Sequence, residues 1–131
     1  MGRGILQFPV VLRASVAGLC LLGLGAALAA GDAERGQTLY KERCSACHSI
    51  RYNGQGPAHA GVVGRAIGRA PGFDYSPALR NAQGVWTEEN LDRWLTDPER
   101  FLPGQRMNVS VEDARDRADL IEFLKSQGKR E

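Results

Sequence analysis

Two cysteines and a histidine lie together in the segment Cys44-Ser45-Ala46-Cys47-His48, and this segment constrains the chain more than any other feature. One helical turn brings both thiols to a common edge, within reach of the two vinyl groups of one porphyrin. The imidazole that follows then faces the iron. The pattern predicts one covalently attached haem c, with thioethers at Cys44 and Cys47 and with His48 as the proximal iron ligand.

The same cysteine pair is also compatible with a redox dithiol or with half of a zinc site. A dithiol of the thioredoxin kind is expected within a βαβ pattern, which the sequence lacks. A zinc site needs further ligands, but Cys20 lies in the apolar N-terminal stretch and His59 is the only other histidine. Haem attachment is therefore the favoured interpretation.

Residues 1–30 have the composition of a secretory signal peptide. Arg3 and Arg13 are their only charges, and the apolar part ends in the small-x-small sequence Ala-Leu-Ala at 27–29. The apolar run is short for a membrane span, which needs about 20 residues, so an uncleaved anchor is the less favoured alternative. We expect export to the periplasm, where bacterial haem attachment occurs, and a mature domain over 31–131.

Removal of Arg3 and Arg13 with the signal peptide leaves 15 basic and 15 acidic residues, so the mature net charge is zero. The charges are mixed and form no basic tract, which argues against a nucleic-acid partner. About 100 residues make one small domain with a modest core, to which a haem would add a large apolar centre. No stable membrane insertion is expected after cleavage.

Caps and apolar spacing predict an all-α domain of about three main helices with loops that wrap the haem. The first helix is expected from Ala33 to Ala46 behind the N-cap Asp32. Gly36 within it is either a tolerated glycine or a place where another helix crosses closely. Residues 49–85 are rich in glycine and proline, which predicts loops with a short helix at 77–81.

Two further helices are predicted in the C-terminal part of the chain. Thr87 is the N-cap of the first, which ends at Asp97-Pro98, where another short turn can start. The second is expected to begin with a capping box of Ser110 and Asp113 and to stop near Gly128.

Met107 is the only methionine beyond the signal peptide. Methionine more often fills a core, but this one follows the Pro103-Gly104 turn in an extended loop. A thioether is a soft ligand that suits haem iron opposite an imidazole and raises its reduction potential. Met107 is therefore the predicted distal ligand.

From Gly31 to about Lys129 the chain resembles the class I cytochromes c of the mitochondrial and related bacterial soluble group. The segments that carry the resemblance are CSACH at 44–48, GP at 56–57, GVVGR at 61–65, APGFDYSPAL at 70–79, VWTEENLDRWLTDPERFLPGQRM at 85–107 and ADLIEFLK at 118–125. The resemblance implies a cytochrome c domain over 31–131 with the small monohaem cytochrome c fold, and electron transfer between redox proteins.

The resemblance also implies roles for single residues. The Pro57 carbonyl would accept a hydrogen bond from the His48 ring. Three residues match positions that hydrogen-bond the inner haem propionate: Arg65, Tyr75 and Trp86. Gln105 stands where a threonine usually helps to bind a propionate. Gly36 and Tyr40 match positions that cross the last helix.

His59 departs from the family pattern, because relatives commonly have leucine at this position beside the proximal histidine. An imidazole here is compatible with ordinary packing or surface placement, with a polar group next to the proximal ligand, or with an alternative iron ligand.

The sequence is thus interpreted as a periplasmic monohaem electron carrier that serves membrane or periplasmic donors and oxidases or reductases. An iron closed by His48 and Met107 has no open position, which favours outer-sphere transfer through an exposed haem edge over catalysis. The alternatives are a haem enzyme or gas sensor, such as a peroxidase, with an open distal position, and an electron-entry subunit of a larger dehydrogenase or oxidase.

Overall fold

The computed structural model describes residues 1–2 and 30–128, so the predicted signal peptide lies almost wholly outside the described residues. The helices of the described part are α1 (Ala33–Arg43), α2 (Pro77–Asn81), α3 (Glu88–Thr96), α4 (Pro98–Phe101) and α5 (Ala114–Ser126). Its β pairing is one isolated bridge between Ala66 and Val85. No helix within 30–128 has the length and apolar character needed to cross a membrane. The prediction of an all-α fold is confirmed.

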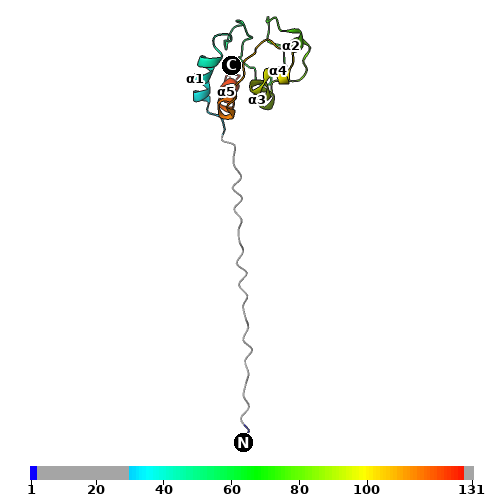
Figure 1. Cartoon of the computed structure of the whole chain (residues 1–131). Coiled ribbons are helices and arrows are strands. Elements are labelled where there is room, and N and C mark those ends of the chain that lie inside the picture. Colours follow the sequence, from blue (N-terminus) through cyan, green and yellow to red (C-terminus); the bar gives the residue numbers. More distant parts are fainter. Residues whose placement is uncertain (3–29, 129–131) are drawn as a thin grey trace.

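Helices α1 and α5 lie side by side, with the shorter helices beyond α5 (Figure 1). A methyl group added to Gly36 on α1 would overlap the backbone carbonyl of Asp119 on α5. Tyr40, one turn later, packs on Phe123 with ring centroids 5.2 Å apart. The predicted close crossing is confirmed, and it explains a glycine at a helix position that favours alanine by about 1 kcal/mol.

Asp119 joins the same two helices through its buried carboxylate. Its Oδ1 accepts the backbone N–H of Asp32, the N-cap of α1, at 2.7 Å. Its Oδ2 accepts from the Arg35 guanidinium, which also donates to Asp116. The hydrogen bond from the Asp32 N–H and, to a lesser extent, the one from Arg35 hold the pKa of Asp119 below its usual range. The carboxylate is therefore ionised at neutral pH and anchors the start of α1.

Local capping fixes several of the predicted boundaries. The Thr87 hydroxyl accepts the Asn90 N–H at 3.0 Å, and the Asp97 carboxylate accepts the Arg100 N–H at 3.0 Å, so these two residues begin α3 and α4. The first helix ends at Arg43, before the predicted Ala46, because the haem-attachment motif itself forms turns.

The predicted capping box at Ser110 is wrong. Helix α5 begins after Asp113, whose carboxylate accepts the Asp116 N–H at 2.9 Å. Val111 is only 1% exposed, and its N–H donates to the Leu95 carbonyl at 2.7 Å. This hydrogen bond to α3 holds the backbone at Val111 outside a helix, so α5 starts later than Ser110.

Gly36→Ala tests the helix crossing. The added methyl must push α5 away, so we expect a loss of about 1–3 kcal/mol in the free energy of unfolding despite the better helix propensity of alanine. Urea unfolding measures this loss. Thr38→Ala on the exposed side of α1 is the control and should stay within about 0.5 kcal/mol of wild type. Equal stability of all three proteins would contradict the crossing.

The Asp119 carboxylate predicts a specific acid sensitivity. Because its folded pKa lies below the unfolded value, near 3.9, its contribution is fully present at higher pH and is lost as the pH falls through the folded pKa. Asp119→Asn should therefore lower stability at neutral pH and flatten the acid limb of the stability profile. Urea unfolding across the acid range checks this, and an unchanged acid limb in the variant would refute the assignment.

Candidate haem site

The backbone of residues 54–57 folds back against His48 and holds its ring in place. Its Nδ1 donates to the Pro57 carbonyl at 2.9 Å, which leaves the Nε2 lone pair for a metal. Gly56 lies against the ring so closely that an added methyl would overlap it. The Gly56 N–H donates to the Cys47 carbonyl at 2.8 Å. Burial lowers the pKa of His48, so the imidazole is neutral, which is the form that binds a metal.

Cys44 and Cys47 lie on the turn that closes α1, where the His48 N–H donates to the Cys44 carbonyl at 2.9 Å. Both cysteines are free thiols in the structure. Burial raises the pKa of the Cys44 thiol to about 11, unlike the low-pKa thiol of a redox dithiol. No group of three or more His, Cys, Asp and Glu side chains within 30–128 can hold a metal ion, so a zinc site has no ligand set there.

The loop that carries Met107 is organised by the buried side chain of Gln105. Its Oε1 accepts the N–H groups of Met107 and Asn108, at 2.5 Å and 3.0 Å. Its Nε2 donates to Glu99 at 3.2 Å and to the Asn108 side chain at 2.8 Å. Gln105 thus fixes the backbone beside Met107, which packs against the hydrophobic core. The role of Gln105 toward a propionate stays a prediction.

Two of the three predicted propionate-binding residues, Arg65 and Trp86, are neighbours. The backbone N–H of Trp86 donates to the Arg65 carbonyl at 2.8 Å. The Arg65 guanidinium donates to the carbonyls of Ala58, at 2.9 Å, and Ala60, at 3.2 Å. Its Nε is buried and has no partner among the described residues. Tyr75 is also buried, and its hydroxyl accepts a backbone N–H at 3.2 Å.

His59, whose role the sequence leaves open, stacks on His48. The ring centroids are 4.1 Å apart, and the planes differ by 20°. Its Nδ1 shares a hydrogen bond of 3.1 Å with the Tyr40 hydroxyl. Burial, followed by the proximity of His48 and Arg65, lowers the pKa of His59 to about 3, so this ring is neutral at physiological pH.

A family model described as cytochrome c matches residues 33–128. The chain belongs to the cytochrome c family. The cofactor of the family is one covalently attached haem c, and its members are haem-based electron carriers. This assignment agrees with the attachment motif at 44–48 and decides against the dithiol and zinc interpretations.

Three proteins similar to this cytochrome c are matched over nearly their full length. Cytochrome c of Euglena viridis is 41% identical over 99 residues, which cover 73% of this chain and 97% of that protein. Cytochrome c2 of Rhodomicrobium vannielii is 37% identical over 120 residues, or 88% of this chain and 95% of the relative. The solved structure of cytochrome cH from Methylobacterium extorquens superposes with a TM-score of 0.70 at 37% identity, over 73% of this chain and 99% of that one.

The side chains of this cytochrome c fit haem c. A buried Nε of Arg65 without a partner among the described residues is costly unless a ligand pairs with it, and a propionate carboxylate is such a ligand. The Nε2 of His48 is the nitrogen left for iron. The sequence motif GP pointed to the Pro57 carbonyl, but the need for a glycine at 56 follows only from the contact with the His48 ring.

Gly56→Ala tests whether the close contact with Gly56 is needed to position the His48 ring. The methyl group must displace the imidazole and its bond to Pro57, so we expect less haem-loaded protein and a more readily displaced proximal ligand. Holoprotein yield and the visible spectrum at decreasing pH measure both effects. Gly128→Ala is the control, because a methyl there meets its neighbours at ordinary distances of 3.6 Å and 3.7 Å. A Gly56→Ala protein with the yield and acid stability of the control would refute the close contact.

Proposed function

We propose that this cytochrome c is an exported monohaem electron carrier, with thioethers at Cys44 and Cys47 and iron ligated by His48 and Met107. The haem iron supplies one-electron redox chemistry. The observation that carries the proposal is the hydrogen bond from His48 Nδ1 to Pro57, because it fixes a neutral imidazole with Nε2 available to the iron. A Met107 thioether opposite it would raise the potential.

The remaining site residues orient the ligands and the haem. Gln105, itself bonded to Glu99, bonds the backbone N–H of Met107 and so would restrict the loop that carries the sulfur. Arg65, with its buried Nε, is proposed to bind the inner propionate together with Tyr75 and Trp86. Charge-assisted hydrogen bonds of this kind also neutralise the propionate away from water.

Outer-sphere transfer follows from the proposed ligand pair. If His48 and Met107 both ligate the iron, no coordination position would remain for a substrate. We therefore propose that electrons pass through an edge of the bound haem to docked proteins and that the iron performs no catalysis.

The composition of residues 1–30 supports cleavage of a signal peptide and a periplasmic domain over 31–131. The partners would be redox proteins, membrane-bound or periplasmic, that dock through small transient interfaces. The mature net charge of zero implies modest long-range steering, so the electron-transfer rate should depend only mildly on salt.

Met107→Ala tests the ligation and thereby the function. Loss of the thioether should lower the reduction potential and open the ferrous iron to carbon monoxide. A potentiometric titration and a carbon monoxide difference spectrum measure the two changes. Thr38→Ala, at an exposed position of α1 outside the loop of Met107, is the control and should keep wild-type values.

Rapid binding of carbon monoxide by the wild-type ferrous protein at neutral pH would contradict this proposal. Such a result would instead indicate an open distal position and a haem enzyme or gas sensor.

A further inference from the structure

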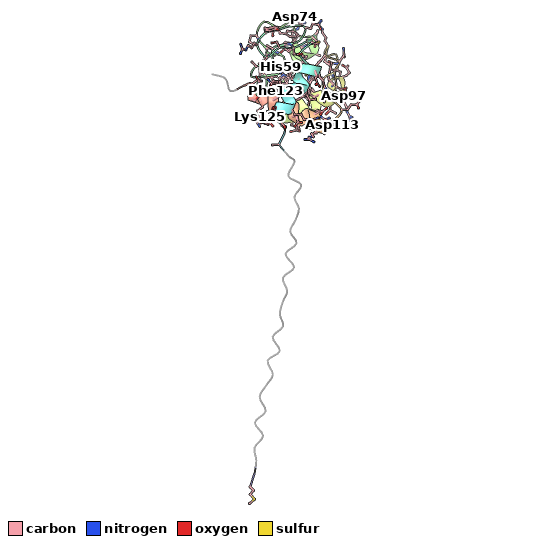
Figure 2. The ribbon with its side chains drawn as sticks, turned by 90° about the vertical axis from the view of Figure 1, so that its left-hand side faces the viewer. His59, Asp74, Asp97, Asp113, Phe123 and Lys125 are labelled. Carbon is pink, nitrogen blue, oxygen red and sulfur yellow. The ribbon has the colours of Figure 1, made fainter. Side chains whose placement is uncertain are left out.

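His59 links the helix pair α1–α5 to the proximal histidine. Tyr40 of α1 packs on Phe123 of α5, and its hydroxyl shares a 3.1 Å hydrogen bond with His59 Nδ1. The other side of this link is the stack of His59 on His48, with centroids 4.1 Å apart. In Figure 2, His59 and Phe123 both lie beside the cyan ribbon of α1. The contacts therefore form a continuous path from the helix crossing to the ring that faces the iron.

The backbone of His59 is tied to the segment that follows the attachment motif. Its N–H donates to the Ser49 carbonyl at 2.9 Å, and its carbonyl accepts the Val62 N–H at 3.0 Å. The Arg65 guanidinium bonds the carbonyls immediately before and after His59. With the backbone anchored at Ser49 and the side chain at Tyr40, the ring has little freedom to move relative to His48.

The stacking geometry excludes His59 as a second ligand of the iron that His48 binds. A nitrogen lone pair lies in the plane of its ring, and the two planes are offset by the stacking distance and inclined by only 20°. While His48 is directed at the iron, the lone pairs of His59 are displaced to one side of it. His59 can act on the iron only through its contact with His48.

We propose that His59 is a positioning residue that, with Tyr40, fixes the orientation of the His48 ring and sets the polarity beside it, thereby coupling the α1–α5 pair to the reduction potential. This proposal rests on the proposed function, because it takes His48 as the iron ligand. Oxidation adds positive charge to the iron and its ligands. A polar, polarisable ring in contact with His48 stabilises that charge better than an aliphatic side chain, which lowers the potential.

Three substitutions in the holoprotein separate the parts of this path. His59→Leu removes both the stack and the hydrogen bond, and it should shift the midpoint potential upward. His59→Phe keeps an aromatic ring without the hydrogen bond, and Tyr40→Phe removes only the hydroxyl; both should give smaller upward shifts. Tyr52→Phe is the matched control, because Tyr52 is 71% exposed, and it should give no shift.

The double variant tests the coupling. If Tyr40 acts through His59, Tyr40→Phe should move the potential of the wild-type protein and add no shift in the His59→Leu background. The hyperfine-shifted haem methyl resonances of the oxidised protein, which depend on the plane of the axial imidazole, should change with the same pattern. If His59→Leu does not load haem, the test is the difference in midpoint potential and methyl shifts between Tyr40→Phe and the control Tyr52→Phe.

Unchanged potentials and methyl shifts in the Tyr40 and His59 variants, with only a lower thermal midpoint, would overturn the proposal and leave His59 as packing. That result is distinguishable from failure of the proposed function, in which the wild-type protein itself would lack a haem c spectrum with a histidine ligand.

Discussion

The hydrogen bond from His48 Nδ1 to the Pro57 carbonyl is the interaction on which the site depends. It selects which imidazole nitrogen is left for a metal, and it holds the ring relative to the backbone that carries both cysteines. Gly56 makes the bond possible, since any larger residue would occupy the space of the ring. The Gly56 N–H in turn donates to the Cys47 carbonyl. The segment 54–57 therefore orients the ligand and also stabilises the turn that carries both cysteines.

The two sides of the site are built in different ways. The proximal side comes from contacts within residues 44–59, close in sequence, and is tied to the helix pair through His59. The distal side is one loop, whose Met107 backbone is bonded by the Gln105 side chain. The Pro57 carbonyl holds His48 by its side chain, whereas the Gln105 side chain holds Met107 by its backbone N–H. Hydrogen bonds at both candidate ligands restrict movement, which suits electron transfer. An enzyme would need one of these sides to open.

Sequence reasoning succeeded where the deciding interactions are local. The N-cap Thr87 and the attachment motif are recognised within a few residues. The crossing at Gly36 is not local, because its contact is with Asp119, and the family resemblance implies it. It failed at Ser110, whose capping pattern is also local, because the Val111 N–H is committed to a carbonyl of α3. The partner of His59 could not be predicted either, since the stack depends on how α1 and the loop after the motif meet in space.

We propose that His48 and Met107 supply the iron of this cytochrome c with one imidazole nitrogen and one thioether sulfur. Iron-edge X-ray absorption on the purified oxidised and reduced protein measures this directly. We expect one sulfur in the first coordination sphere together with the pyrrole and imidazole nitrogens, in both redox states. A first sphere of nitrogen alone, or a water oxygen in place of sulfur, would contradict it.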